Sequence, residues 1–384
     1  MSSDAVDLLA ADVASRLASV RIVDVEAIPF TLPYRRPPRF ASGAVERADN
    51  VLVRIHTDAG LVGHAEAQPR PYTYGETQAS IVGAIRGWFA PRLVGLRPGA
   101  IEEARVACAG LAGNHCARGA VDVALWDLLG QLAGAPCSAL LGGFADRVAV
   151  AHMLSFDTPE AMAEDALTMH DEHGISAFKV KVGRDPDLDV AAFAAVRDAL
   201  PGADLYADAN RGWTLEQAIR AGDALVGLGV TAIEEPIAMD DRRGRALLAA
   251  RWEVPLAGDE SCLSVVDVRR AIDEGAVGQV SMKAARTGFS ESRDVLALCR
   301  AHHLKAVVGS QYEGALGTLA SIALGAAFGE LASRPVEASN FLDLGSDLLA
   351  EPPRIVDGHV AVPAAPGLGA AVDEDLLAAH RLEG

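Results

Sequence analysis

Five charged residues recur at nearly equal intervals in the second half of this 384-residue chain. They are Lys181, Asp208, Glu234, Asp259 and Lys283, and the intervals between them are 27, 26, 25 and 24 residues. Each stands at or near the end of a short apolar segment, so each is expected at the end of a strand. Because one strand and one helix fit into such an interval, successive members should reach the same edge of a parallel sheet.

The order of these residues favours a particular chemistry. Three carboxylates that converge from adjacent strands are oxygen ligands suited to one hard divalent cation, Mg²⁺ or Mn²⁺. Lysines on either side can transfer protons, and the cation can stabilise negative charge on a carboxylate substrate. Lys179 has the same parity as Lys181, so both should point inward. Repulsion between the two ammonium groups should then lower the proton affinity of one of them.

The elements that must position these residues form a repeating pattern. After residue 143, eight short apolar segments are predicted strands, and all but the last lead into a helical segment. The segments are 148–154, 177–183, 203–209, 231–236, 254–260, 278–284, 305–310 and 335–339. Ser310 and Glu337 continue the spacing by 27 residues each. Eight strands in this order predict an α/β barrel, whose active site lies at the C-terminal rim.

Three further segments surround the predicted barrel domain, 144–347. Residues 21–143 start with strand-like segments joined by a turn at Asp58-Ala59-Gly60, continue as amphipathic helices, and predict an α+β capping domain. Residues 1–20 are expected to be a leader or an extra helix, since they lack the basic start and apolar run of a signal peptide. Residues 348–384 are loop-rich and are expected to return to the capping domain.

The composition excludes several classes of partner. A formal net charge of −18 disfavours nucleic acid and anionic membrane surfaces, and no apolar stretch is long enough to cross a bilayer. Five cysteines without a Cys-x-x-Cys pair favour a reducing, cytoplasmic location. The expected partner is a small-molecule carboxylate substrate, which local positive charge must attract against the overall field.

Motifs around these residues resemble those of the muconate-lactonizing-enzyme subgroup of the enolase superfamily. They are FKVKVG (178–183), DANRGWT (208–214), IEEP (233–236), GDES (258–261) and SMKAARTGF (281–289). The resemblance covers nearly the whole chain from about Arg21. It implies a modified TIM (β/α)7β barrel with an N-terminal α+β capping domain. It also implies a homo-oligomer, since family members are commonly dimers or octamers.

Carried over by motif, the resemblance assigns roles to individual residues. Asp208, Glu234 and Asp259 would be the metal ligands, and Lys181 and Lys283 the acid/base pair. Enolase-superfamily sites with a lysine base and a metal-stabilised enediolate are an established pattern. A histidine base of the mandelate-racemase type is disfavoured, because the sixth strand offers a lysine.

Three neighbouring residues would support this centre. Lys179 would tune Lys181. Asn210 and Glu260 would lie close to the metal and to Lys283.

Substrate specificity in this subgroup lies in two capping-domain loops that close over the barrel mouth. The matching stretches are 31–43 and 67–77. They offer positive charge and hydroxyl groups for substrate binding from Arg35, Arg36, Arg39, Arg70, Tyr72 and Tyr74. A cationic lid on so acidic a protein favours a dicarboxylate such as cis,cis-muconate.

The expected reaction is therefore cycloisomerization of cis,cis-muconate, or a related dicarboxylate, to muconolactone through an enolate. Racemases of N-acylated amino acids, dipeptide epimerases and o-succinylbenzoate synthases share the lysine pair and remain alternatives. Dipeptide epimerases carry an Asp-x-Asp pair near the eighth strand, whereas here Asp343 is followed by Leu344 and Gly345. The missing second aspartate disfavours a dipeptide epimerase.

Other classes of barrel protein account for fewer of these residues. An amidohydrolase-type metallohydrolase needs a His-x-His pair on its first strand, where this chain offers His152 alone. A lysine Schiff-base aldolase has no need of three aligned carboxylates. A non-catalytic binding protein that keeps a structural metal is a third rival. Metal-dependent exchange of a carbon-bound substrate proton with deuterated solvent would separate an enolate enzyme from all three.

Overall fold

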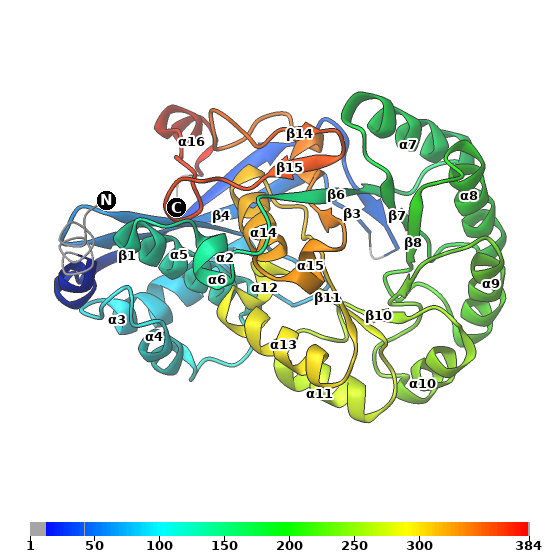
Figure 1. Ribbon diagram of the computed structural model, residues 1–384, viewed down its shortest axis with the longest axis horizontal. Coiled ribbons are helices and arrows are strands. Elements are labelled where there is room, and N and C mark those ends of the chain that lie inside the picture. Colours follow the sequence, from blue (N-terminus) through cyan, green and yellow to red (C-terminus); the bar gives the residue numbers. More distant parts are fainter. Residues whose placement is uncertain (1–12, 42, 383–384) are drawn as a thin grey trace.

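The computed structural model describes residues 13–41 and 43–382 (Figure 1). An antiparallel sheet with its helices forms the N-terminal part, and parallel strands enclosed by an outer layer of helices form the larger part. Residues 13–19 are helical, whereas residues 1–12 of the predicted leader lie outside the described residues. The predicted α/β class, a (β/α)7β barrel beside an α+β capping module, is confirmed.

The capping sheet has the strand order β1-β4-β5, with the bounds Ile22–Pro33, Arg47–Thr57 and Val62–Ala67. The predicted turn joins β4 to β5, and its Gly60 has φ 74°, a conformation that glycine adopts without steric cost. Two short strands, β2 (Arg39–Phe40) and β3 (Gly43–Ala44), pair with each other in the loop between β1 and β4.

The longest capping helix, α5 (His115–Ala133), is buried on nearly all sides because it lies between the capping sheet and the barrel. It packs on β4 and β5 on one side and on helix α12 (Ala284–Thr287) on the other. The remaining helical elements of this part are α2 (Gln78–Ala84), η1 (Ile85–Phe89), α3 (Ala90–Leu93), α4 (Ile101–Cys108) and α6 (Cys137–Leu141).

Parallel strand pairs run from β6 to β12, and β13 pairs back with β6. The strands are β6 (Arg147–Leu154), β7 (Ala177–Lys181), β8 (Asp204–Asp208), β9 (Ile233–Glu234), β10 (Leu256–Gly258), β11 (Gln279–Met282), β12 (Lys305–Val308) and β13 (Val336–Glu337). Each lies within, or overlaps, a predicted segment. Several end earlier than predicted, because the last residues of those segments turn into the loops at the rim.

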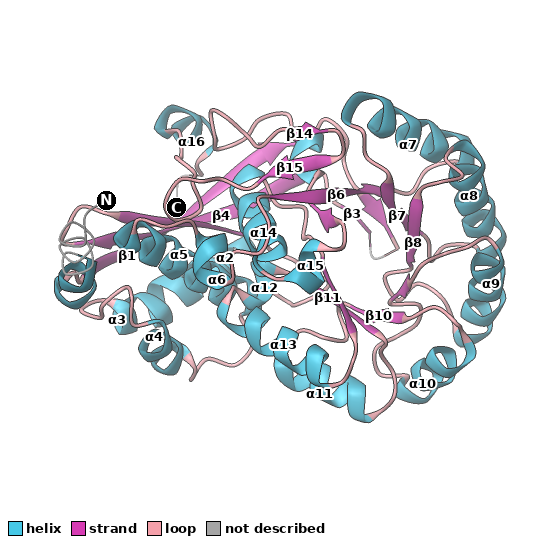
Figure 2. Ribbon diagram, in the orientation of Figure 1, coloured by secondary structure: helices cyan, strands magenta, loops and turns pink. Residues whose placement is uncertain are grey.

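Helices cover the outside of the barrel (Figure 2). They are α7 (Pro159–His173), α8 (Pro186–Ala199), α9 (Leu215–Gly227), α10 (Arg242–Arg251), α11 (Val265–Asp273), α13 (Ser290–Ala301), α14 (Ala315–Ala327) and α15 (Gly329–Ala332). Side chains cap several N-termini, as at Thr158 before α7 and Asp185 before α8, each followed by proline in the first turn.

The C-terminal segment contacts both parts of the molecule. Strands β14 (Ile355–Val356) and β15 (His359–Ala361) form a hairpin, and β15 pairs antiparallel with β6. Helix α16 (Glu374–His380) then packs against β1, and the backbone N–H of Leu382 donates to Pro29 O at 2.8 Å. The chain end is thus tied to the first strand of the capping sheet.

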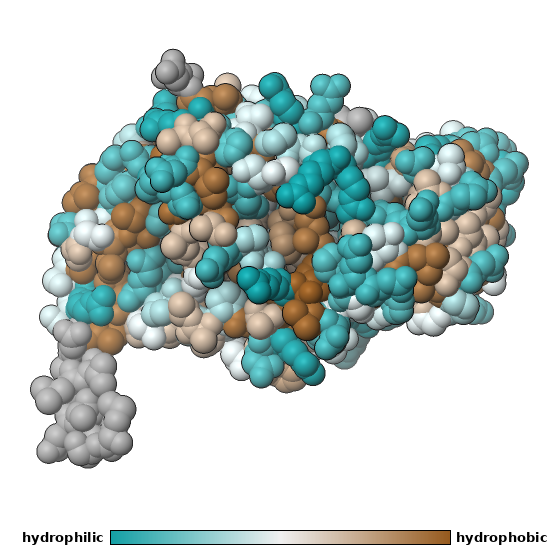
Figure 3. Space-filling model, turned by 90° about the horizontal axis from the view of Figure 1, so that it is seen from above, coloured by the Kyte–Doolittle hydropathy of each residue, from teal (hydrophilic) through white to brown (hydrophobic). Residues whose placement is uncertain are grey.

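The visible surface is largely polar (Figure 3), although half of the residues in the chain are hydrophobic. In Figure 3, hydrophilic residues cover much of the visible face, with apolar residues scattered among them. Val106, Val266 and Phe144 are the most exposed large apolar side chains within the described ranges. No helix among these residues combines the length and apolar character needed to cross a membrane.

Gly63 of β5 marks the contact between the capping sheet and α5. A Cβ atom there would lie 2.3 Å from Ala124 O and 2.7 Å from Leu128 Cγ. We expect Gly63→Ala to lower the free energy of unfolding by about 1–3 kcal/mol, because the helix must shift to relieve this overlap. Urea unfolding followed by circular dichroism measures the loss. In the control Gly83→Ala, the added Cβ meets no atom within 4 Å. An equal loss in that variant would contradict the packing argument.

Candidate active site

The barrel strands bring the five predicted charged residues to one rim. In the pairing register, Lys181 of β7 lies beside Asp208 of β8, and Asp208 lies beside Glu234 of β9. Asp259 directly follows β10, and Lys283 directly follows β11. All five are buried, with exposed fractions of 7% or less. The equal spacing in the sequence therefore corresponds to neighbouring positions at successive strand ends.

The loops after β8 and β9 hold non-glycine residues in a left-handed backbone conformation. Asn210 has φ 41°, Arg211 has φ 66° and Glu235 has φ 40°. Such conformations cost on the order of 1–3 kcal/mol each and persist only where the surroundings impose them. Here the N–H of Asn210 donates to Asp208 Oδ1 at 2.9 Å, and the N–H of Arg211 donates to Glu235 O at 2.7 Å. The first bond holds Asn210 against Asp208, and the second joins the loop after β8 to the loop after β9.

Lys179 lies at the centre of the rim and contacts three carboxylates. Its Nζ lies 2.6 Å from Glu337 Oε1, 2.9 Å from Glu234 Oε1 and 3.5 Å from Asp208 Oδ2. Lys181 Nζ donates to the same Asp208 Oδ2 at 2.6 Å, so the two lysines share one carboxylate oxygen. Both lysines are buried, as their shared parity on the strand predicted.

Lys283 forms a second cluster with Asp259 and Arg286. Lys283 Nζ donates to Asp259 Oδ2 at 2.5 Å, and Arg286 Nη1 donates to Asp259 Oδ1 at 2.6 Å. Arg286 also donates to Tyr74 OH at 3.3 Å, which joins this part of the rim to the capping domain. Each carboxylate oxygen of Asp259 therefore faces a cation.

Asn210 and Glu260 connect the two clusters. Asn210 Oδ1 accepts a hydrogen bond from Lys181 Nζ at 2.7 Å, and Asn210 Nδ2 donates to Glu260 Oε1 at 3.2 Å. Burial, together with the negative charge of Asp259, raises the pKa of Glu260 to about 7. The structure thus places Asn210 against Asp208 and Lys181, and Glu260 close to Asp259.

Carboxylates raise the proton affinities of two lysines of the rim, Lys179 and Lys283. Burial lowers the pKa of Lys179, but attraction to Glu234 and two further carboxylates outweighs burial and raises the pKa well above its ordinary value. The pKa of Lys283 is raised as well, because attraction to Asp259 outweighs burial. Of the two lysines expected to repel each other, Lys179 and Lys181, the predicted lowering therefore does not occur at Lys179. A divalent cation that drew these carboxylates to itself would weaken this attraction.

The rim has the chemistry of a divalent-cation site. Glu234 is fully buried, and its Oε2 has no hydrogen-bond partner among the described residues. Burial raises the pKa of this carboxyl group well above its usual range, and Lys179 compensates only in part. A buried carboxylate oxygen without a partner is costly, and a cation would satisfy it. Asp208, Glu234 and Asp259 fit Mg²⁺ or Mn²⁺ in donor type.

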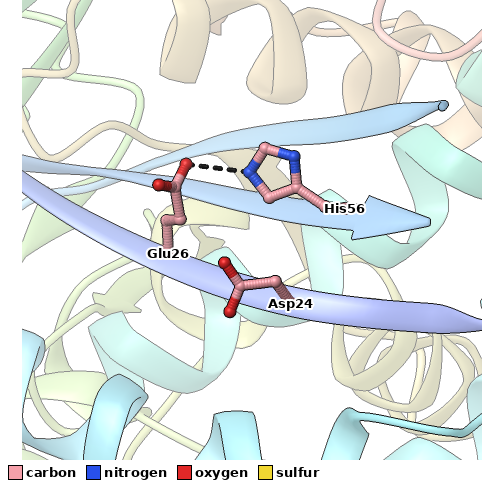
Figure 4. Close-up of side chains that lie close together, drawn as sticks. All are labelled: Asp24, Glu26 and His56. Atoms are coloured by element: carbon pink, nitrogen blue, oxygen red, sulfur yellow. Dashed lines mark hydrogen bonds and ion pairs between the residues drawn. The ribbon is translucent and has the colours of Figure 1, made fainter. Parts of the chain in front are cut away.

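A different group has the tightest ligand spacing among the described residues. Ligand atoms of Asp24, Glu26 and His56 all lie within 4.8 Å of one another, on β1 and β4 of the capping sheet (Figure 4). His56 Nε2 lies 2.8 Å from Glu26 Oε2, and Asp24 is exposed. None of the three lines the barrel cavity. We interpret the group as a surface ion pair with a neighbouring carboxylate. The rim carboxylates lack this spacing because lysine ammonium groups lie among them.

A cavity at the barrel mouth is lined by residues of both domains. The capping loops contribute Phe40, Arg70, Tyr72 and Tyr74, and the barrel contributes both lysines of the predicted acid/base pair. The centroid of the Phe40 ring lies 5.4 Å from Lys181 Nζ, and the Phe40 and Tyr72 ring centroids are 5.8 Å apart. The aromatic side chains of the lid therefore cover the rim end of β7, where Lys181 lies.

Three predicted substrate-binding arginines lie outside this lining. Arg35 and Arg39 are exposed. Arg36 Nη1 lies 2.5 Å from Asp165 Oδ1 on α7, and its Nη2 lies 2.7 Å from Asp343 Oδ1 in the short helix η2 (Asn340–Asp343). Attraction to these two carboxylates directs Arg36 to the barrel wall instead of the cavity.

Positive charge from the lid reaches the cavity through Arg70. Its Nη1 donates to Pro69 O at 2.7 Å, and within the described chain no carboxylate lies within 4.0 Å of its guanidinium group. Burial lowers the pKa of Arg70, but attraction to Tyr72 and Tyr34 outweighs burial and raises it. Arg70 is therefore a cation without an ion-pair partner that faces the cavity.

Sequence analysis did not identify Arg286, Gln311 or Tyr312, although Gln311 and Tyr312 line the cavity and Arg286 binds Asp259. Arg286 lies three residues after Lys283 on a one-turn helix, and this helical spacing is a signal that could have identified it. The two residues of the β12 loop carry no such signal, because loop conformation places them.

Comparison with known proteins covers both parts of the chain. Residues 17–142 match the N-terminal domain of the mandelate racemase / muconate lactonizing enzyme family, and residues 161–376 match the enolase C-terminal domain-like family. A solved muconate lactonizing enzyme from Mucobacterium Smegmatis, complexed with muconolactone, is 43% identical with a TM-score of 0.93. The match covers 94% of this chain and 100% of that chain.

Two further relatives differ in activity. Muconate cycloisomerase 1-2 of Acinetobacter lwoffii is 35% identical over 368 residues, which is 93% of this chain and 94% of the relative. A dipeptide epimerase from Cytophaga hutchinsonii, solved with Mg and the dipeptide D-Ala-L-Val, is 28% identical. Its TM-score is 0.88, and the match covers 94% of this chain and 98% of that one.

Fold and rim together define a capped-barrel enzyme of the isomerase and epimerase type. The chain belongs to the mandelate racemase/muconate lactonizing enzyme family of the enolase superfamily, and within it to the muconate-lactonizing-enzyme subgroup, as the motifs predicted.

Lys179 supplies positive charge to three buried carboxylates. Lys179→Met keeps the side-chain length and removes the charge. In EDTA, we expect the free energy of unfolding to fall by about 3–5 kcal/mol, because the carboxylates lose their counter-charge. The loss should be smaller at about pH 5 than at about pH 8. Carboxyl groups without a cation have raised folded-state pKa values, so they take up protons as the pH falls and the penalty then disappears. Urea unfolding at both pH values measures these effects.

Arg300→Met is the control for this variant, since it removes the exposed ion pair between Arg300 and Glu330. Exposed pairs contribute little, so its stability should change little. A loss in Lys179→Met that is no larger than in this control would show that the buried contacts do not stabilise the rim.

Proposed function

We propose that the protein is a metal-dependent cycloisomerase that converts cis,cis-muconate, or a closely related dicarboxylate, to muconolactone. Arg70 carries this proposal, because it is a cavity-lining cation that no protein carboxylate within ion-pair distance neutralises. A guanidinium group binds a carboxylate in a bidentate manner, and the hydroxyls of Tyr72 and Tyr74 lie in the same lining. The 43% identity to a muconate lactonizing enzyme supports the same reaction.

In this proposal Asp208, Glu234 and Asp259 hold one Mg²⁺ or Mn²⁺. When bound, the cation supplies positive charge for the substrate carboxylate on which negative charge accumulates. Arg70 orients the second carboxylate, one oxygen of which adds to a double bond of the same molecule to close the lactone ring. The Nζ of Lys181 or Lys283 then gives a proton to the carbon that carries the negative charge.

A racemase or epimerase of N-acylated amino acids or dipeptides is the second candidate. Two lysines in one cavity could remove and return a proton at an α-carbon, and the dipeptide epimerase relative supports this reaction. Against a dipeptide stands Asp343, which is 5% exposed and lies 2.7 Å from Arg36. Because it is already paired, it has little attraction left for a substrate ammonium group. An o-succinylbenzoate synthase would use the same lysine pair.

The substrate is tested by incubating the Mg²⁺- or Mn²⁺-loaded protein with cis,cis-muconate and following loss of the conjugated-diene absorbance. N-acyl amino acids and dipeptides are screened in parallel by polarimetry. We expect lactonization to dominate, and Arg70→Met to raise the KM for muconate by about tenfold or more through loss of a charge-assisted contact. Arg35→Met, at an exposed position outside the cavity lining, is the matched control. Efficient racemization with negligible lactonization would reject the cycloisomerase.

The acid/base pair is tested with Lys181→Ala and Lys283→Ala. Each should lower kcat by about 10²–10⁴-fold, because a positioned proton donor or acceptor is lost. Each should still bind the metal, which calorimetry can verify. Lys305→Ala, at an exposed position at the start of β12, should leave kcat unchanged. Near-wild-type rates in both active-site variants would exclude the lysines from proton transfer.

A further inference from the structure

Glu235 is a fully buried carboxylate that the proposed mechanism does not use. It directly follows Glu234 at the end of β9, but the two side chains have different partners. Glu234 contacts Lys179 inside the rim, whereas Glu235 contacts Arg245 on helix α10. Glu235 also has the left-handed φ of 40° described above. Burying a charge in a strained segment is costly, so the contacts of Glu235 must compensate for that cost.

Glu235 Oε1 accepts three hydrogen bonds from the loop that follows β10. The donors are Asp259 N at 2.7 Å, Ser261 N at 2.9 Å and Ser261 Oγ at 2.6 Å. Glu235 Oε2 accepts a bond from Arg245 Nη1 at 2.6 Å, and Arg245 Nη2 donates to Ser261 Oγ at 2.8 Å. These bonds close a ring through three side chains. They tie the backbone on both sides of Glu260 to strand β9 and helix α10.

Arg245 also offsets the charge of Glu235. It is 2% exposed, so the two groups meet in surroundings of low dielectric constant. Without Arg245, Glu235 would add another negative charge beside Glu234 and Asp259. The ion pair therefore provides acceptors for the loop backbone without adding net charge at the rim.

We propose that Glu235 and Arg245 are positioning residues that fix Asp259 for metal binding. The proposal rests on the proposed function, in which Asp259 is a metal ligand. The backbone N–H of Asp259 is held by Glu235, while its carboxylate is directed toward Lys283 and Arg286 at the rim. A ligand whose backbone is already fixed loses less conformational freedom when it binds a cation, so its metal affinity is higher.

The test is a Mn²⁺ titration of Glu235→Gln, followed by the electron paramagnetic resonance signal of free Mn²⁺. All variants carry His56→Ala, which removes the competing group on the capping sheet. Glutamine keeps an oxygen for the loop N–H groups but loses the ion pair with Arg245. We expect the Kd for Mn²⁺ to rise by about 10- to 100-fold in protein that circular dichroism shows to be folded.

If Glu235→Gln does not fold because Arg245 is left unpaired, the double variant Glu235→Gln/Arg245→Met replaces it. Removing both charges of a buried pair is far better tolerated than removing one. The double variant should show the same rise in Kd, because the ring that holds the loop is still broken.

Asp127→Asn is the matched control. Asp127 is also a buried carboxylate that accepts backbone hydrogen bonds, from Leu368 N at 2.7 Å and His64 N at 2.9 Å, but it lies on α5 and does not line the cavity. The Asp127→Asn protein should be less stable but should keep its Mn²⁺ affinity. Loss of a purely structural carboxylate is therefore expected to leave the Kd for Mn²⁺ unchanged.

The outcomes separate this proposal from the proposed function. Glu234→Gln, which alters a ligand directly, should lose most of its Mn²⁺ affinity. Unchanged affinity in Glu234→Gln would overturn the ligand assignment, and the positioning proposal with it. If Glu234→Gln loses Mn²⁺ affinity while Glu235→Gln keeps it, the positioning proposal alone is overturned. An equal loss in Glu235→Gln and Asp127→Asn would also overturn it.

Discussion

The arrangement of the barrel mouth depends on the balance of charge in a volume from which water is excluded. An uncompensated charge there costs several kcal/mol, so every buried carboxylate of the rim must meet a cation or a set of N–H donors. Lys179 meets this requirement for three strands at once, since Glu337, Glu234 and Asp208 all contact its Nζ. The balance is incomplete at Glu234 Oε2 and at Glu260 Oε2, which have no hydrogen-bond partner among the described residues.

The balance of buried charge at the rim also involves the capping domain. Arg286 extends from the barrel to both Asp259 and Tyr74, so a residue of the lid belongs to the charge network of the rim. On the far side of the mouth, Phe40 lies over Lys181. The rim and the lid are therefore linked by direct contacts, although separate parts of the chain form them.

The sequence predicted the barrel and the positions of its rim residues because both follow from a repeat. Strand ends spaced by one βα unit must lie side by side, which places Lys181, Asp208 and Glu234 correctly without tertiary information. The path of a lid loop follows no repeat, so the sequence could not distinguish Arg36, which contacts the barrel wall, from Arg70, which faces the cavity. The raised pKa of Lys179 was missed for a similar reason, because it depends on counter-ions from three other strands.

The ion pair between Arg36 of the lid and Asp165 differs in its sensitivity to ionic strength from the buried contacts of Lys179 at the rim. The Arg36 side chain is 43% exposed and that of its partner Asp165 is 26% exposed, so dissolved salt can screen their attraction. The contacts of Lys179, which is 2% exposed, are shielded from mobile ions by the protein around them. Rising salt concentration therefore weakens the Arg36–Asp165 contact of the first capping loop more than the contacts of Lys179 at the rim. The lid and the rim that it covers thus respond differently to the electrolyte in which the protein is dissolved.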